Sequence, residues 1–276
     1  MKTNMTKRKP AAKEAHPGLD EQLAAVVAEL KRLGSKRARE AMARYGIPAD
    51  NAFGVPVGAI QRVAKRLGRN HELAAGLWKT GQYEPRMLAA FLDEPARVTA
   101  AQMDRWCRDF DSWAICDTVC LHLFDRTPHA FAKVEQWCDG GAKGAEFIKR
   151  GAFALLASLA LHDKVTGDEA FARCLPLVER AATDERNFVK KGVSWALRGV
   201  GERSVALNTA ALAVARRLAA SPDAAARWVG KDVLRQLASP AVLRRLAARS
   251  ARAGAAKTAR PASGRPPGSR AAPASA

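Results

Sequence analysis

The sequence has no set of cysteines that would build a disulfide framework or a structural metal site. Its five cysteines are an odd number and include no C-x-x-C pair. Cys116 and Cys120 are four residues apart, which is the spacing of one helix face rather than of a zinc knuckle. An iron–sulfur spacing of four cysteines is also absent. We therefore expect buried free thiols in a reducing compartment, and no metal or other cofactor.

The motifs of several enzyme classes are missing as well. The chain contains no H-E-x-x-H, no G-x-G-x-x-G, no G-x-x-x-x-G-K-[ST] and no G-x-S-x-G. Its five histidines show no metal-ligand spacing. These absences argue against metal-dependent hydrolysis, nucleotide-driven chemistry and a serine triad.

Long hydrophobic runs are also absent. No apolar segment reaches the length of a membrane span. The N-terminus carries bases but lacks the apolar segment of a signal peptide. We expect a cytoplasmic protein.

Acidic residues are few compared with basic ones. Lys and Arg total 46 and Asp and Glu total 27, which gives a net charge of +19. Residues 1–18 and 251–276 are basic, rich in Ala, Pro, Gly and Ser, and too poor in apolar residues to fold, so we predict two disordered tails. The segment between them, 19–250, still carries +10. A basic folded domain with basic tails indicates a polyanionic partner.

Residues 19–250 show helical periodicity and almost no alternation of apolar and polar residues. The first predicted helix carries Leu23, Val26, Val27 and Leu30 on one face, and another begins near Pro56. Short Gly- or Pro-containing breakers divide the segment into a dozen or more helices. The fold class predicted from this pattern is all-α.

Three stretches of the chain are similar to one another. They are FIKRGAFALL from Phe147, FVKKGVSWAL from Phe188 and WVGKDVLRQL from Trp228, and their starts lie 41 and 40 residues apart. Self-similarity at this period is typical of HEAT-type repeats. We predict an α-solenoid of HEAT-like helical repeats with a curved, basic concave surface.

The fourth residue of each repeat is basic. It is Arg150, Lys191 or Lys231, and a looser copy from Tyr83 places Arg86 there. A row of such bases would bind a polyanion. The stretch AICDTVCLHL places an acid, Asp117, in the same position. A carboxylate beside phosphates loses Coulomb energy, so this position indicates a chemical role, although a surface aspartate beside a core tryptophan is the simpler interpretation.

Two tryptophans have polar partners at helical spacing. Asp111 or Ser112 can cap a helix that begins near Trp113, and Asp117 then lies one turn later on the same face. In KKGVSWALR, Lys191, Trp195 and Arg198 form one stripe directly after Lys190. Lys149 and Arg150 form a further basic pair. Each tryptophan is either a core residue flanked by extended bases or an exposed ring that contacts a nucleotide.

Over about residues 20–240 the chain resembles the AlkD-type DNA alkylation repair glycosylases, a family built from HEAT-like repeats. The resemblance rests on the W-x-x-x-D of Trp113 and Asp117, then on Arg150 and Trp195. It implies that these four residues form the active site of a monofunctional DNA glycosylase. The implied substrate is double-stranded DNA with cationic N3- or N7-alkylated purines, whose N-glycosidic bond is hydrolysed without base flipping. We predict DNA contacts from Arg86, Lys149, Lys190, Lys191, Arg198 and Lys231.

Two other functions are compatible with the same residues. One is a non-catalytic HEAT-like scaffold that binds DNA or another polyanion, and the other is a protein-interaction solenoid with a basic surface. We expect a monomer that is associated with the nucleoid when it is bound to DNA. Release of an alkylpurine from methylated DNA separates the enzyme from both alternatives.

Overall fold

The computed structural model describes residues 18–139 and 146–258, and all the regular structure in them is helical. The prediction of an all-α fold is therefore confirmed. The fourteen α-helices are α1 (Leu19–Leu33), α2 (Lys36–Met42), α3 (Val57–Leu67), α4 (His71–Lys79), α5 (Tyr83–Leu92), α6 (Ala100–Arg108), α7 (Trp113–His122), α8 (Ala130–Cys138), α9 (Glu146–His162), α10 (Asp168–Ala181), α11 (Asn187–Gly201), α12 (Val205–Ala219), α13 (Ala224–Leu237) and α14 (Pro240–Thr258). Three short 3-10 helices are η1 (Ala43–Tyr45), η2 (Pro95–Arg97) and η3 (Phe124–Arg126).

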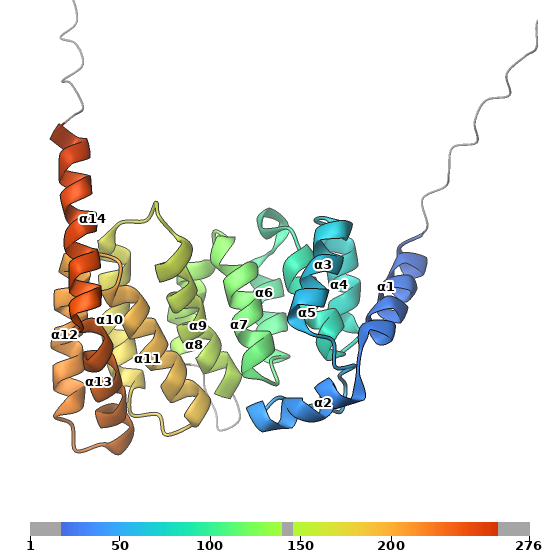
Figure 1. Cartoon of the computed structure of the whole chain (residues 1–276), viewed down its shortest axis with the longest axis horizontal. Coiled ribbons are helices and arrows are strands. Elements are labelled where there is room, and N and C mark those ends of the chain that lie inside the picture. The colour runs from blue at the N-terminus through green and yellow to red at the C-terminus, as the bar shows by residue number, and fades with distance from the viewer. Residues whose placement is uncertain (1–17, 140–145, 259–276) are drawn as a thin grey trace, which may run out of the picture.

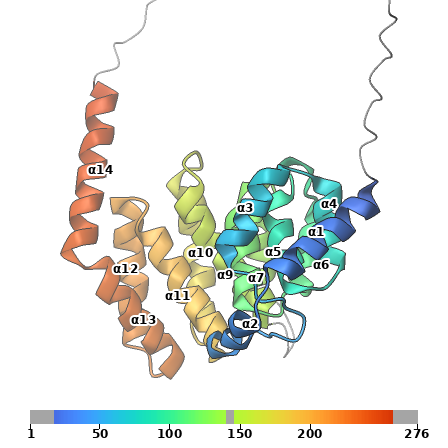
Figure 2. The same ribbon diagram turned by 45° about the vertical axis from the view of Figure 1, so that its right-hand side comes forward.

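The helices are stacked side by side along one axis, from α1 at one end to α14 at the other (Figure 1). One layer is formed by α3, α5, α7, α9, α11 and α13, each packed against the next. The helices α8, α10 and α12 pack against this layer. This arrangement is the predicted solenoid. The turned view shows α2 beside the lower ends of α7 and α11 (Figure 2).

Hydrogen bonds between successive helices of the first layer follow the sequence repeat. Arg150 bonds the Phe188 carbonyl at 2.7 Å, Ser194 bonds Asp232 at 2.6 Å and Arg198 bonds Gln236 at 2.7 Å, and each pair is 38 residues apart. The helices α9, α11 and α13 are therefore parallel and in register. Their N-terminal ends, which carry the repeated aromatic residues, lie along one edge of the solenoid.

One continuous hydrophobic core runs through the stack. Its largest fully buried side chains include Phe124, Phe153 and Phe171. Trp78 and Trp106 stack face to face with ring centroids 4.0 Å apart, which joins α4 to α6. All five cysteines are buried free thiols, as the sequence predicted.

The connection before α3 is held by a buried carboxylate. Glu84 of α5 is fully buried and accepts backbone N–H groups of Phe53, Gly54 and Val55 at 2.8, 2.7 and 3.1 Å. Gly54 has φ of +79°, and a Cβ atom there would lie 2.3 Å from the Ser35 carbonyl oxygen. This connection leads from α1 and α2 back into the stack, so it fixes where α2 lies.

Replacing Glu84 with alanine is expected to lower the free energy of unfolding by about 3 kcal/mol or more, because three buried N–H groups lose a charged acceptor. Urea denaturation followed by circular dichroism measures this loss. Glu40→Ala is the matched control, since its side chain is exposed on α2. Equal stability of the two variants would contradict the stabilising role of the Glu84 hydrogen bonds.

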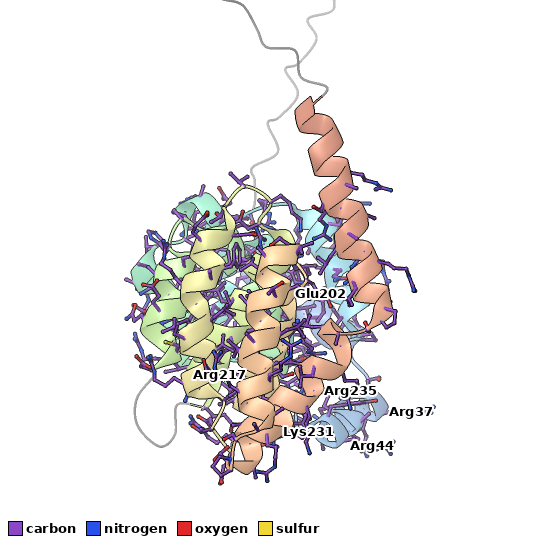
Figure 3. All side chains as sticks on the ribbon, turned by 90° about the vertical axis from the view of Figure 1, so that its left-hand side faces the viewer. Arg37, Arg44, Glu202, Arg217, Lys231 and Arg235 are labelled. Carbon is purple, nitrogen blue, oxygen red and sulfur yellow. The ribbon has the colours of Figure 1, made fainter. Side chains whose placement is uncertain are left out.

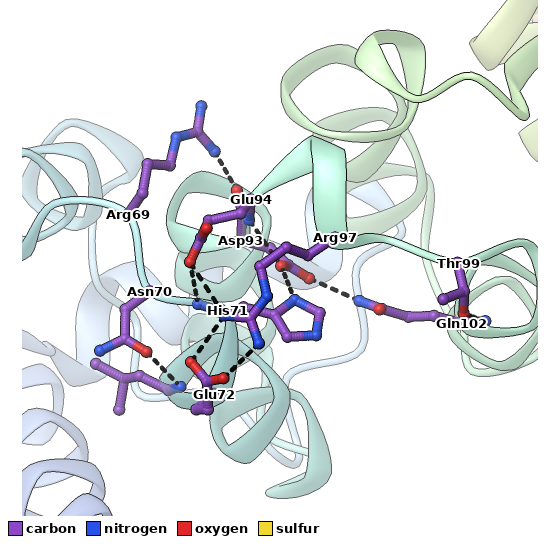
Figure 4. A network of polar contacts seen from close by, with 10 residues as sticks. Arg69, Asn70, His71, Glu72, Asp93, Glu94, Arg97, Thr99 and Gln102 are labelled. Carbon is purple, nitrogen blue, oxygen red and sulfur yellow. Dashed lines mark hydrogen bonds and ion pairs between the residues drawn. The ribbon is translucent and has the colours of Figure 1, made fainter.

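A second polar network ties α4, α5 and α6 together at their ends (Figure 4). Asp93, which follows α5, is fully buried and contacts His71 Nδ1 and Gln102 Nε2, both at 2.6 Å. Its other partner is the backbone N–H of Glu94 at 2.7 Å. Because these polar groups are satisfied inside the stack, they fix the orientation of the first repeats.

The last helix, α14, runs into the segment that was predicted to be the C-terminal tail. The folded segment was expected to end at residue 250, whereas α14 continues to Thr258. Ala and Arg are strong helix formers, so this Ala-rich stretch extends a helix even though it offers little apolar surface to pack. The rest of both predicted tails lies outside the described residues. Across the described residues, no helix combines the length and apolar character needed to cross a bilayer.

Candidate active site

A cavity of about 620 Å³ opens at the edge where α7, α9 and α11 begin. The turn η1 and Gly46, which follow α2, border it from a distant part of the sequence. The first two turns of the three helices supply the other lining residues. The full lining is Arg44, Tyr45, Gly46, Trp113, Asp117, Arg150, Asn187, Phe188 and Lys191.

Trp113 and Asp117 share one face of α7. Ser112 is the N-cap, and its hydroxyl accepts the Ile115 N–H at 3.5 Å. Trp113 is consequently the first helical residue, and Asp117 lies one turn later. Both side chains line the cavity.

Asp117 and Arg150 form a bidentate ion pair. Arg150 Nε donates to Asp117 Oδ1 at 2.9 Å, and Nη2 donates to Oδ2 at 2.7 Å. The Nη1 group donates to the Phe188 carbonyl at 2.7 Å, and the side chain is 8% exposed. With three N–H groups bound to the protein, Arg150 orients the carboxylate instead of standing free to hold a phosphate.

Burial raises the pKa of the Asp117 carboxyl above its ordinary value, and the charge and hydrogen bonds of Arg150 oppose this shift. The Asp117 side chain is 15% exposed, and that exposed part faces the cavity. Each carboxylate oxygen accepts one N–H from Arg150, which leaves further lone-pair positions on both oxygens. The carboxylate can therefore act on a bound group while it stays paired.

The turn after α2 closes one side of the cavity. Trp113 Nε1 donates to the Tyr45 carbonyl at 2.8 Å, which fixes the indole against this turn. Gly46 has φ of +66°, and a Cβ atom there would lie 3.2 Å from the tip of the Phe188 ring. The turn therefore requires glycine at position 46 both for its backbone and for its contact with Phe188.

Two bases at the cavity carry no counterion. Arg44 and Lys191 are exposed and line the cavity. Throughout residues 18–139 and 146–258, no ion pair involves either of them. Since Asp117 is neutralised by Arg150, these two cations give the cavity a positive charge that suits a phosphodiester.

Trp195 does not line the cavity. It lies on α11 one turn beyond Lys191, where its ring is partly buried against the core. The residue that contributes an aromatic ring from α11 is Phe188, whose ring centroid lies 5.5 Å from that of Phe147. The structure thus brings together three of the four predicted catalytic residues and places Phe188 at the site in addition.

Four of the predicted DNA contacts are already engaged within the protein. Arg86 lies 3.8 Å from Asp111 and over the Trp78 ring, away from the cavity. Lys149 pairs with Asp184 at 3.0 Å, and Arg198 bonds Gln236. The Lys190 ammonium lies 5.1 Å from the centroid of the Trp228 ring.

Lys191 and Lys231 remain exposed, and Lys191 borders the cavity directly. Figure 3 shows that Lys231 and Arg235 of α13 lie on the same side of the molecule as Arg37 of α2 and Arg44 of η1. Bases from the two ends of the stack therefore flank the side on which the cavity opens.

The sequence did not identify the part of the site that lies before α3. Arg44, Tyr45 and Gly46 belong to no repeat, so periodicity gave no reason to select them. Asn187 directly precedes the second repeat and Phe188 is its first residue. The aromatic residue at the first position of each repeat was the signal that could have identified Phe188. Among the described residues, no three His, Cys, Asp or Glu side chains gather closely enough to hold a metal ion.

The fold agrees with comparisons to known proteins. One solved structure is similar to this chain, with a TM-score of 0.65 and 21% sequence identity. The match covers 77% of this chain and 94% of the chain in that structure. That protein is described as belonging to a new family related to the HEAT-like repeat DNA glycosylases, with affinity for branched DNA structures. No curated protein matches the chain. The family model for DNA alkylation repair enzymes matches residues 26–251, and the chain belongs to that family.

Proposed function

We propose that this protein is a monofunctional DNA glycosylase that hydrolyses the N-glycosidic bond of cationic N3- or N7-alkylated purines in duplex DNA. The observation that carries the proposal is the Asp117 carboxylate, which Arg150 holds at 2.9 and 2.7 Å in a cavity bordered by Trp113 and Phe188. Membership of the DNA alkylation repair family supports it.

The chemistry requires only one carboxylate. An N3- or N7-alkylated purine is already cationic and leaves without a general acid, unlike the leaving group of an ordinary glycoside. Its departure leaves positive charge on the deoxyribose. The Asp117 carboxylate would stabilise that charge and orient the attacking water.

The remaining lining residues would position the nucleotide. The rings of Trp113 and Phe188 would pack against the deoxyribose, whose C–H groups suit an aromatic face. Arg44 and Lys191 would bind phosphates beside the lesion. Because the sugar would meet Asp117 from the backbone side, the base need not rotate out of the helix, in contrast to most glycosylases.

A search for released bases tests the proposal. Duplex DNA treated with a methylating agent is incubated with the protein, and free bases are separated by chromatography. We expect N3-methyladenine or N7-methylguanine in solution and strand breaks only after alkali treatment. Strand breaks without alkali would indicate a lyase step, for which the Lys191 amine at the cavity is the available nucleophile.

A non-catalytic DNA-binding scaffold is the second candidate. It is favoured by one observation, namely that both carboxylate oxygens of Asp117 are already bound by Arg150. A structural ion pair would have the same geometry. Tight, salt-sensitive binding to alkylated duplex with no base release at any protein concentration would favour this function.

The rate of base release is expected to fall at acid pH. Ionised Asp117 is the active form, and burial raises the pKa of this carboxyl, so the carboxylate is lost as pH falls through a value above the aspartate norm of about 3.9. Single-turnover rates on an N7-methylguanine duplex, corrected for spontaneous release, measure this. DNA affinity should not follow the same curve. An inflection at or below the aspartate norm would contradict the role of burial.

A further inference from the structure

One edge of the solenoid carries aromatic rings that the core does not use. Tyr45 is 67% exposed and Trp228 is 39% exposed, and Phe188 between them is half-buried. We refer to Tyr45, Phe188 and Trp228 as the aromatic rim. Trp and Tyr rings with this much exposed surface are typical of binding sites, because they gain most when a partner covers them.

Residues next to these rings in sequence link them along the edge. Gly46, next to Tyr45, packs against the tip of the Phe188 ring. Phe188 and Lys190 both lie in the first turn of α11, and the Lys190 ammonium is 5.1 Å from the centroid of the Trp228 ring. The rim therefore runs from the turn after α2, past the cavity, to the start of α13.

Basic residues alternate with these rings. Arg44 precedes Tyr45, Lys190 and Lys191 follow Phe188, and Lys231 follows Trp228 by three residues. Of the acids near the rim, Glu185 is exposed just before α11, and three others are engaged within the protein. Asp184 pairs with Lys149 at 3.0 Å and Arg186 at 2.6 Å, Glu146 accepts the Phe188 N–H at 3.2 Å, and Asp223 caps α13 through the Ala226 N–H at 2.7 Å. The rim is consequently an aromatic surface with a net positive charge.

We propose that the aromatic rim binds unpaired nucleotides of single-stranded DNA, with bases stacked on Tyr45 and Trp228 and phosphates contacted by Arg44 and Lys231. In a duplex the base faces are covered by their neighbours, so only an unpaired strand offers a face to an aromatic ring. Alternation of aromatic rings and bases along a groove is typical of single-strand binding. This proposal does not depend on glycosylase activity.

Fluorescence anisotropy with the full-length protein tests it. The probes are a labelled 12-nucleotide oligo(dT) and a blunt duplex of mixed sequence, neither with a lesion. Trp228→Ala is expected to weaken oligo(dT) binding about fivefold or more and to change duplex affinity less than about twofold. Tyr45→Ala is expected to weaken oligo(dT) binding by a similar factor and duplex binding less, because Tyr45 also borders the cavity. Tyr45→Phe and Trp228→Phe should retain most of the affinity, because a ring remains to stack on.

The salt dependence of binding separates stacking from general electrostatics. The dependence of oligo(dT) affinity on salt should be unchanged in the alanine variants, since no charge is lost. Val165→Ala is the matched control, because Val165 is 96% exposed on the α9–α10 loop away from the rim. Circular dichroism confirms that each variant is folded. Unchanged oligo(dT) affinity in both variants, or an equal loss on oligo(dT) and duplex, would overturn the proposal.

Discussion

Asp117→Asn is expected to abolish release of alkylated bases while duplex affinity stays equal or rises. The asparagine amide is nearly the same size as the carboxylate but carries no charge to stabilise a positive sugar. Loss of one such electrostatic group typically lowers a rate by a factor of about 100 to 1,000. Removal of the carboxylate also removes repulsion from phosphates and leaves the Arg150 charge unpaired, which accounts for the retained affinity.

Single-turnover release and anisotropy, measured on the same N7-methylguanine duplex, provide both values. Asp232→Asn is a suitable control, because Asp232 is another partly buried aspartate that contacts an arginine and a serine of the neighbouring helix. Its side chain is 18% exposed, close to the 15% of Asp117. Release by Asp117→Asn at the wild-type rate would reject the assigned role.

The second large effect is expected from Arg150→Ala. This change leaves the buried Asp117 carboxylate without its partner and removes the bond to the Phe188 carbonyl. Breaking a buried ion pair from one side typically costs about 3 to 5 kcal/mol of folding free energy. An unpaired carboxylate would also take up a proton more readily, so base release should fall with stability.

Arg150→Lys separates the two consequences. A lysine keeps the positive charge near Asp117 but cannot reproduce the two parallel N–H bonds. We therefore expect most of the stability to return and the rate of release to recover only in part. Unchanged stability of Arg150→Ala in urea denaturation would contradict the structural role of the pair.

Lys191→Ala, by contrast, should weaken DNA binding and lower its salt dependence by about one unit without loss of stability.

The repeats were predictable because each one must present the same face to its neighbours. Phe147, Phe188 and Trp228 mark equivalent positions, and their spacing predicted the solenoid. The parallel arrangement of α9, α11 and α13 comes from the structure. The pairing of Trp113 with Asp117 followed from one capped helix start. These features depend on local periodicity, which a single sequence records.

The rest of the site depends on contacts between residues far apart in sequence, which the repeat spacing does not predict. The turn at Tyr45 reaches the cavity because Glu84 anchors the following connection and because Trp113 donates to the Tyr45 carbonyl, 68 residues away in sequence. Trp195 matches the family's residue type and order. The cavity, however, is formed at the start of α11, and Trp195 lies two turns further along that helix. Helical spacing identified its face but could not say how far along the helix the site extends.

The most direct test of the account is single-turnover release of N7-methylguanine from a defined duplex by the wild-type protein, measured at increasing protein concentration. The account predicts a release rate that rises with protein and reaches a plateau well above the spontaneous rate, at the concentration where binding saturates. No acceleration at a concentration that fully binds the duplex would contradict it, and would leave a DNA-binding solenoid whose carboxylate only supports the fold.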